Sequence, residues 1–208
     1  MIGQKTLKSN VLNHFSAISP GVESILKDMK FDEWFGVEVL DEDLTFRSLC
    51  KTIVGQQLAG KAADAIFARF EELCNKNIVP EIILKIEDQK IRDVGLSWAK
   101  VRSVKDLATK VVSGDLILSG LEKLGDEELI EELSKVKGIG RWTAEMFLMF
   151  RLGREDIFSW GDLGLKNGLK KFLNNPEASM AEMEAEVSKW APFRTYGSIA
   201  MWHLLDNR

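Results

Sequence analysis

Residues 133–150, with the sequence LSKVKGIGRWTAEMFLMF, carry the strongest structural pattern in this chain of 208 residues. The pattern predicts a helix, a tight turn and a second helix. We expect Gly138 and Gly140 to shape the turn, because glycine adopts positive-φ conformations at little steric cost. The second helix would begin at Arg141, where backbone N–H groups without helical partners can bind a phosphate. An ordinary helix-turn-helix with glycine caps fits this segment equally well.

The composition is typical of a globular protein, with 45% hydrophobic and 29% charged residues. A chain of this length holds one sizeable core or two small lobes. No apolar run approaches the roughly 20 residues of a membrane span, and the first residues lack the apolar core of a signal peptide. We therefore expect an intracellular protein without a membrane partner, cytoplasmic in a prokaryote or nuclear in a eukaryote.

The formal net charge of −4 argues mildly against nucleic-acid binding, although an average over the chain hides local patches. Basic residues gather at 100–105, 135–141 and 166–171, and acidic residues at 41–43, 126–132 and 177–186. Together the basic clusters would suit an anionic partner. Taken one at a time, each cluster is more typical of a solvated helix face.

Helical periodicity runs through nearly every long segment, and strand alternation does not. The pattern predicts helices over 44–54, 61–74, 80–93, 97–112, 126–136, 141–150, 162–173 and 195–205, a helix beginning at Ser19-Pro20 and another at Ser179. Ser97, Asp126 and Asp162 are the expected N-caps, and Ser179 with Glu182 forms a capping box. We predict an all-α protein, one domain over residues 1–208. Its two helical lobes would hold the hairpin motif, about residues 129–150, at the cleft between them.

Cysteine and tryptophan positions add two expectations about the core. Cys50 and Cys74 should be buried thiols, and two cysteines cannot supply the four ligands of a structural zinc or an iron–sulfur cluster. Among the six tryptophans, Trp34, Trp98 and Trp190 are expected to pack in the core.

Asp162 precedes the segment LGLKNGL and is, taken alone, an ideal helix N-cap. It also follows the second hairpin helix, where the chain must turn back. With IVGQQLAGKAA at 53–63, VKGIGRWTAEMF at 136–147, GDLG at 161–164 and WAPFRTYGSIAMWHL at 190–204, the chain resembles the 3-methyladenine DNA glycosylase II family. That family belongs to the helix-hairpin-helix superfamily of base-excision DNA glycosylases. The resemblance runs from about residue 44 to residue 202 in the family's order and spacing.

The resemblance implies that the hairpin binds double-stranded DNA that contains damaged bases. The hairpin contacts to a DNA phosphate would come from Lys137, Gly138, Gly140 and Arg141. In the family a monovalent cation, sodium or potassium, often sits on backbone carbonyls of the hairpin. Here those carbonyls would belong to Ser134, Val136 and Gly138; no other cofactor is expected.

The Gln-Gln-Leu stretch matches the family's wedge. The resemblance implies that Gln57 fills the gap left by a flipped-out nucleotide and that Leu58 supports it in the minor groove. Without the family, a helix end with a buried leucine would be the simpler interpretation of both residues. Ala59 stands where many relatives have serine or histidine.

The family match also implies a base pocket and a catalytic group. Trp142, Met146, Trp160 and Trp202 would line the pocket, since indole faces attract electron-poor methylated purines. Met146 stands where relatives often have tyrosine, which bears on lesion choice among 3-methyladenine, 7-methylguanine, hypoxanthine and ethenoadenine. Asp162 would stabilise positive charge on the sugar and activate a water.

Trp142 occupies the position at which relatives that also cut the DNA backbone carry a Schiff-base lysine. An indole cannot form an imine, so we expect a monomeric, monofunctional hydrolase for alkylation damage in base excision repair, without lyase activity.

Two other functions remain open at this point. One is a DNA-structure-binding protein that keeps the hairpin without catalysis. The other is an all-α protein-interaction module, which the net charge favours.

Overall fold

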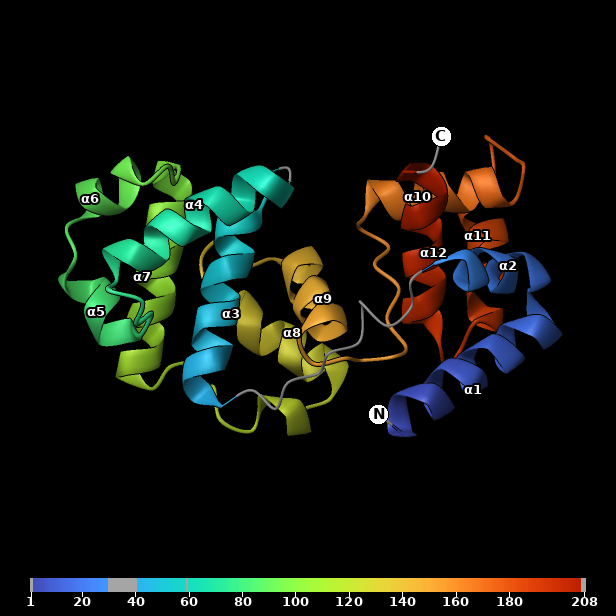
Figure 1. The fold of residues 1–208 in the computed structure, drawn as a ribbon, viewed down its shortest axis with the longest axis horizontal. Coiled ribbons are helices and arrows are strands. Elements are labelled where there is room, and N and C mark those ends of the chain that lie inside the picture. The colour runs from blue at the N-terminus through green and yellow to red at the C-terminus, as the bar shows by residue number, and fades with distance from the viewer. Residues whose placement is uncertain (1, 30–40, 59, 207–208) are drawn as a thin grey trace. The chain divides into compact units, whose positions relative to one another are not determined.

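The computed structural model describes residues 2–29, 41–58 and 60–206. These residues form helices joined by turns, with no strand among them (Figure 1). The helices are α1 (Ile2–Ile18), α2 (Pro20–Asp28), α3 (Glu42–Gly55), α4 (Gly60–Leu73), α5 (Pro80–Lys85), α6 (Asp88–Asp93), α7 (Trp98–Ser113), the 3-10 helix η2 (Leu121–Lys123), α8 (Asp126–Ser134), α9 (Arg141–Phe150), α10 (Leu163–Phe172), α11 (Met180–Lys189) and α12 (Arg194–Asp206). The all-α prediction is confirmed. None of these helices is both long and apolar enough to cross a membrane.

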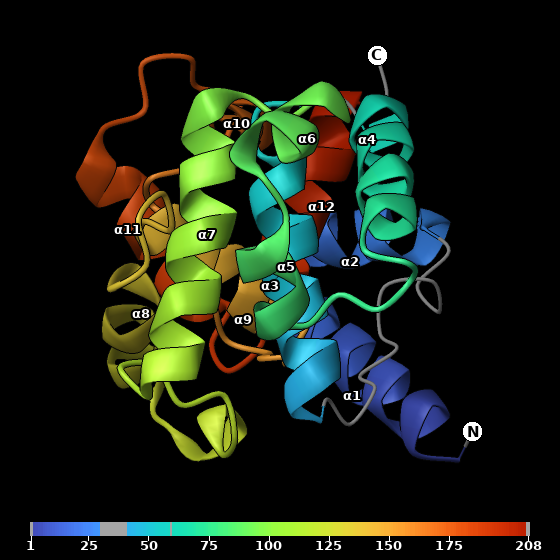
Figure 2. The same cartoon turned by 90° about the vertical axis from the view of Figure 1, so that its left-hand side faces the viewer.

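The chain forms two compact units, and the division between them falls inside α9. Unit 1 comprises residues 1–37 and 148–208, and unit 2 comprises residues 38–147. In unit 1, α10 packs against α12, while α2 packs against α1 and α12. In unit 2, α7 packs against α3, α5 and α6 (Figure 2).

The core of unit 1 is centred on Trp190, whose side chain is fully buried, as predicted. The rings of Phe15, Phe158 and Phe172 surround its indole with centroid distances of 6.4, 6.0 and 6.4 Å. The edge-on orientation of these rings is the favoured geometry for aromatic pairs. This cluster joins α1, α10 and the segment before α10 into one packed body.

We expect Gly168→Ala to destabilise unit 1 because α10 and α12 approach closely at this residue. A Cβ atom at position 168 would lie 2.5 Å from the Met201 carbonyl oxygen and 2.9 Å from the Met201 Cβ. Overpacking costs about 1–3 kcal/mol, which outweighs the helix propensity of about 1 kcal/mol that alanine adds. Urea unfolding measures the change. Gly161→Ala, which meets no atom within 4 Å, is the control and should leave the unfolding free energy unchanged.

The core of unit 2 contains both cysteines, which are buried and free, as predicted. Burial raises the pKa of the Cys50 thiol, and it raises the pKa of Cys74 to about 11, with a further contribution from the Glu71 carboxylate. Both thiols are therefore protonated packing groups, since the thiolate is the reactive form.

The helix predicted over 80–93 is wrong in one respect, because the structure has two short helices there, α5 and α6. Ile86 and Glu87 have extended backbone conformations between them. The Lys105 ammonium donates to the carbonyls of Leu84 at 3.3 Å and Ile86 at 2.5 Å. A cation that binds the last carbonyls of a helix stabilises its end, and this one comes from α7, a helix remote in sequence.

Three further predictions differ from the structure. Gly125, rather than Asp126, is the N-cap of α8, and Asp126 lies in the first turn. Ser19 precedes α2 as expected, but its hydroxyl donates to Glu186 at 3.0 Å instead of capping the helix. Trp98, the first residue of α7, is 47% exposed. Trp34 lies outside the described residues.

Candidate active site

The predicted site residues fall into two sets, one in each unit. Unit 2 carries the wedge, the hairpin and two pocket residues, namely Gln57, Leu58, Ser134, Val136, Lys137, Gly138, Gly140, Arg141, Trp142 and Met146. Unit 1 carries Trp160, Asp162 and Trp202.

The predicted hairpin is present, with α8 ending at Ser134 and α9 beginning at Arg141. Gly138 has a φ of 82°, a left-handed conformation that favours glycine. A side chain there would also collide with the hydroxyl of Ser103 on α7. Gly140, in contrast, has no positive φ, so the expectation that both glycines supply left-handed backbone is wrong for Gly140. The turn is closed by Ile139, whose N–H donates to the Val136 carbonyl at 3.0 Å.

The hairpin offers backbone donors to an anion. In the described part of the chain, the N–H groups of Gly138, Gly140 and Arg141 donate to no protein acceptor. The Lys137 N–H, in contrast, donates to the Asp106 carboxylate at 2.8 Å. Unpaired N–H groups at the start of a helix are favourable for a phosphate.

Acidic side chains accompany the cations of the hairpin. The Arg141 guanidinium pairs with Glu127 on α8 and, at 3.4 Å, with Glu145. The hydrogen bond from Arg141 lowers the pKa of the Glu127 carboxyl. The Lys137 ammonium lies 3.7 Å from Asp106, and its side chain is 77% exposed. The Arg141–Glu127 pair is exposed on both sides, and exposed ion pairs contribute little to stability, so Arg141 can exchange this carboxylate for a phosphate at low cost. Glu145, in contrast, is buried.

Two of the three carbonyls expected to bind a cation accept hydrogen bonds. The Val136 carbonyl accepts from Ile139, and the Gly138 carbonyl accepts from the Gln56 side-chain amide at 2.8 Å. Each carbonyl oxygen has a second lone pair, so the cation site stays a prediction. The described residues contain no group of three or more His, Cys, Asp or Glu side chains that could hold a metal ion.

The two residues predicted to form the wedge, Gln57 and Leu58, lie on the surface just after α3. Gln57 is exposed and has a φ of 58°, an uncommon conformation for a residue with a side chain. Such strain costs on the order of 1 kcal/mol and is concentrated at functional sites. Leu58 is 38% exposed, which contradicts the simpler interpretation of a buried leucine at a helix end. Ala59 lies outside the described residues.

Two pocket candidates lie on α9. Trp142 is 41% exposed, and Met146 is partly buried. Their spacing of four residues places them on one side of the helix, while Ala144 and Phe147 are buried. The role of the Trp142 indole in stacking on a base stays a prediction.

Asp162 caps α10, as predicted. Its Oδ1 atom accepts the Leu165 N–H at 2.7 Å and the indole N–H of Trp202 at 3.3 Å. Asp162 is partly buried. The packing of α12 on α10 therefore brings together two residues that the sequence proposed for one site, and two donors orient the carboxylate.

The other aromatic residues of unit 1 differ in their surroundings. The Trp202 ring lies 5.9 Å from the Phe150 ring, centroid to centroid. Trp160 packs against Phe158 at 4.4 Å and contacts the core cluster. A pocket role for Trp160 stays a prediction.

An ion pair anchors the start of α12, the helix that carries Trp202. The guanidinium of Arg194 donates to both Asp156 oxygens at 2.7 Å, and the Arg194 N–H donates at 3.2 Å. These bonds hold the pKa of Asp156 below its ordinary value of 3.8. The sequence offered no signal for this pair, because its members are far apart in the chain.

The lowered pKa predicts acid sensitivity. At pH values between the folded and the unfolded pKa of Asp156, the unfolded chain binds more protons than the folded chain. The stabilisation that the Asp156–Arg194 pair gives the folded protein is therefore complete above pH 3.8 and is lost as the pH falls below that value. Asp156→Asn should lower the unfolding free energy by about 1 kcal/mol at pH 6, and this difference should disappear in acid. Urea unfolding across this range tests the prediction, with Glu184→Gln on α11 as a control that should match wild type at every pH.

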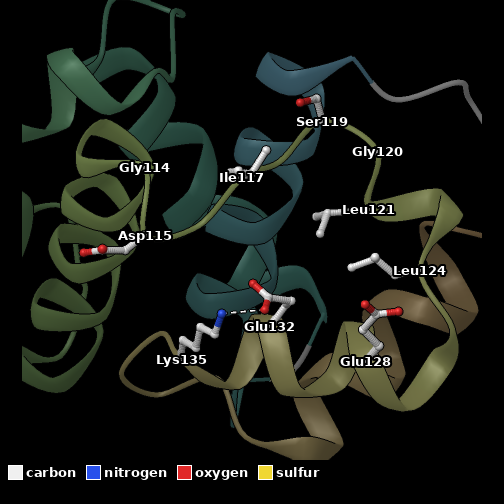
Figure 3. Close-up of a pocket in the computed structure, with 10 residues that line it drawn as sticks. All are labelled: Gly114, Asp115, Ile117, Ser119, Gly120, Leu121, Leu124, Glu128, Glu132 and Lys135. Carbon is white, nitrogen blue, oxygen red and sulfur yellow. Dashed lines mark hydrogen bonds and ion pairs between the residues drawn. The ribbon is translucent and has the colours of Figure 1, made fainter.

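A surface hollow of about 440 Å³ lies between the segment after α7 and helix α8 (Figure 3). Ile117, Leu121 and Leu124 face it together with Glu128, and the Glu132–Lys135 pair lies at its edge. The predicted pocket residues do not line it.

The fold of this chain is similar to that of known DNA glycosylase structures. The chain is similar to a DNA-3-methyladenine glycosidase from Bacillus halodurans, with a TM-score of 0.70, 35% identity and coverage of 88% of each chain. It is also similar to a Schizosaccharomyces pombe 3-methyladenine DNA glycosylase in complex with abasic DNA, with a TM-score of 0.75, 30% identity and coverage of 93% of this chain and 95% of that one. The fold is therefore that of helix-hairpin-helix glycosylases.

The sequence comparison identifies the family. Residues 50–193 match the model described as "HhH-GPD superfamily base excision DNA repair protein", and the chain belongs to this superfamily. It is 37% identical to DNA-3-methyladenine glycosylase 1 of Schizosaccharomyces pombe over 161 residues, which are 76% of this chain and 71% of that protein. The predicted resemblance is thus confirmed.

Proposed function

We propose that this protein is a monofunctional DNA glycosylase that flips alkylated purines out of duplex DNA and hydrolyses their N-glycosidic bond. The reaction would begin base excision repair of alkylation damage. The geometry of Asp162 carries the proposal, since one carboxylate oxygen is held by both a helix N–H and the Trp202 indole. The names of the similar glycosylases support 3-methyladenine as a substrate.

The proposed chemistry needs one well-placed carboxylate. Methylation weakens the bond between base and sugar, so the base leaves readily and positive charge develops on the sugar. Asp162 would stabilise that charge and orient or deprotonate the attacking water. Because Asp162 is oriented before the substrate arrives, little reorganisation is required during the reaction.

The other residues would bind the substrate. The hairpin N–H groups of Gly138, Gly140 and Arg141, with the Lys137 ammonium, would hold a phosphate, and a sodium or potassium ion on the hairpin carbonyls would add to this contact. Gln57 and Leu58 would fill the gap in the duplex. Stacking of the flipped purine on an indole would be the role of Trp142 in unit 2 and of Trp202 in unit 1, and Met146 and Trp160 are further candidates for contact with the base. The protein would act as a monomer.

Release of free base from alkylated duplex DNA tests the proposal. We expect wild-type protein to release 3-methyladenine and 7-methylguanine in the presence of a chelator of divalent metals, as measured by chromatography. Duplexes with hypoxanthine or ethenoadenine define the lesion range. Binding to DNA without release would instead support the DNA-structure-binding function, which the hairpin alone can perform. Failure to bind DNA would support a protein-interaction module.

We expect borohydride not to trap the wild-type protein on DNA. Trapping requires an imine between a lysine amine and the opened sugar, and the position that supplies this lysine in lyases is Trp142. A known bifunctional glycosylase serves as the positive control under the same conditions. A covalent protein–DNA adduct on a denaturing gel would contradict the monofunctional assignment.

A further inference from the structure

The residue before the wedge has a side chain that reaches the hairpin. Gln56 follows α3, and its backbone leads directly into the left-handed Gln57. The Gln56 amide nitrogen donates to the Gly138 carbonyl at 2.8 Å and to the Thr143 hydroxyl at 3.1 Å. One side chain therefore bonds to the hairpin turn and to the first turn of α9. All of these residues belong to unit 2.

A lysine fixes the same segment from the other side. The Lys100 ammonium donates to the Val54 carbonyl at 2.8 Å and to the Gln56 carbonyl at 2.5 Å. These carbonyls lie at the carboxyl end of α3, where a positive charge complements the helix dipole. Lys100 thereby binds the backbone at the point where the chain leaves α3 and enters the wedge segment.

Helix α7 supports the wedge segment and the hairpin with one face. Lys100, Ser103 and Asp106 follow each other at intervals of three residues, which places them on one side of the helix. Ser103 lies against Gly138, and Asp106 accepts the Lys137 N–H at 2.8 Å. The wedge segment and the phosphate-binding turn are thus attached to the same helix and to each other.

We infer that Gln56 and Lys100 are positioning residues that hold the Gln57–Leu58 wedge at a fixed place relative to the hairpin. This inference rests on the proposed function. A duplex held by a phosphate at the hairpin presents its bases at a set distance, and a wedge enters the stack only if it lies at that distance. Base flipping costs the free energy of stacking and pairing of the flipped base. A wedge that moves freely would fill the gap in the duplex only part of the time and would offset little of that cost. Gln56 then affects the rates of base flipping and excision, whereas the hairpin N–H groups affect the affinity for any DNA duplex.

Gln56→Met tests the inference, because methionine keeps the length of the side chain and removes the amide donor. Loss of these hydrogen bonds should reduce the single-turnover excision rate about tenfold. The Kd for an undamaged duplex should stay within about twofold of wild type, since phosphate contacts are independent of base flipping. The fluorescence of 2-aminopurine beside the lesion should show less flipping. Lys100→Met should produce the same pattern.

A double-mutant cycle adds a readout that a general loss of stability would not produce. Thr143→Val removes one of the two acceptors of the Gln56 amide, so it should have a smaller effect than Gln56→Met. The combined variant should excise no more slowly than Gln56→Met alone. Gln89→Met, which removes an exposed amide on α6 that bonds to Asp93, is the matched control and should behave as wild type.

Three outcomes would overturn the inference. The first is wild-type excision and flipping by Gln56→Met. The second is an equal loss of excision and of affinity for undamaged DNA, which would make Gln56 a part of the hairpin fold only. The third is an absence of any flipping signal with the wild-type protein. If wild-type protein flips a base without releasing it, the proposed catalysis fails while the positioning role is still decided by the 2-aminopurine signal.

Discussion

Asp162→Asn is expected to slow base excision at least about 100-fold, the scale on which the loss of one key catalytic group acts. The asparagine oxygen can still accept the N–H of Leu165 and the indole N–H of Trp202, and asparagine is as good an N-cap as aspartate. Helix α10 should therefore keep its start, and only the negative charge is lost. Single-turnover release of 3-methyladenine measures the effect.

Measurements of DNA binding and of protein stability distinguish a catalytic role of Asp162 from a structural one. The Kd of Asp162→Asn for lesion-containing duplex and its unfolding free energy should both stay close to wild type. Asp115→Asn, in the segment after α7, removes a carboxylate outside the predicted site and should excise normally. Undiminished excision by Asp162→Asn would remove this residue from the mechanism and leave it as a helix cap.

Gly138→Ala should have the largest effect on the hairpin. A left-handed backbone costs a residue with a side chain about 1–2 kcal/mol, and the new methyl group would collide with the Ser103 hydroxyl. We expect the hairpin of the free variant to relax from this turn, so that a bound phosphate has to restore the turn at that cost. Since 1.4 kcal/mol corresponds to a factor of ten in affinity, DNA binding should weaken about tenfold. Fluorescence anisotropy with an undamaged duplex measures the change, and urea unfolding measures the accompanying loss of stability.

Two further variants separate the effect of backbone strain at Gly138 from that of the collision with Ser103 and from that of contact with the phosphate. Ser103→Ala in the Gly138→Ala background removes the hydroxyl but not the backbone strain, so it should restore only part of the stability. Gly140→Ala should leave stability unchanged, because Gly140 has no positive φ and a Cβ there meets no atom within 4 Å. It should nevertheless weaken DNA binding, since its methyl group would occupy space needed by the phosphate. Normal DNA binding by Gly140→Ala would place the phosphate elsewhere.

Local patterns in the sequence were sufficient for much of the fold. The hairpin, the Asp162 cap of α10, the Ser97 cap of α7 and the Ser179–Glu182 capping box all lie where they were expected. Each of these features involves residues within a few positions of one another, so the residues themselves specify the interaction. The helix predicted over 80–93 is instead divided at Ile86 and Glu87, where Lys105 from a different helix binds the last carbonyls of α5, a contact that no local pattern indicates.

The sequence by itself determined the all-α class, the hairpin, the family and the identity of Asp162 as the candidate catalytic carboxylate. Only the tertiary structure decided how that carboxylate is held by Trp202, how Arg194 and Asp156 anchor α12, and how Gln56 links the wedge segment to Gly138. These contacts join residues about 40 to 80 positions apart. Periodicity and capping rules describe neighbours along one helix, whereas a hydrogen bond between helices depends on how their surfaces pack.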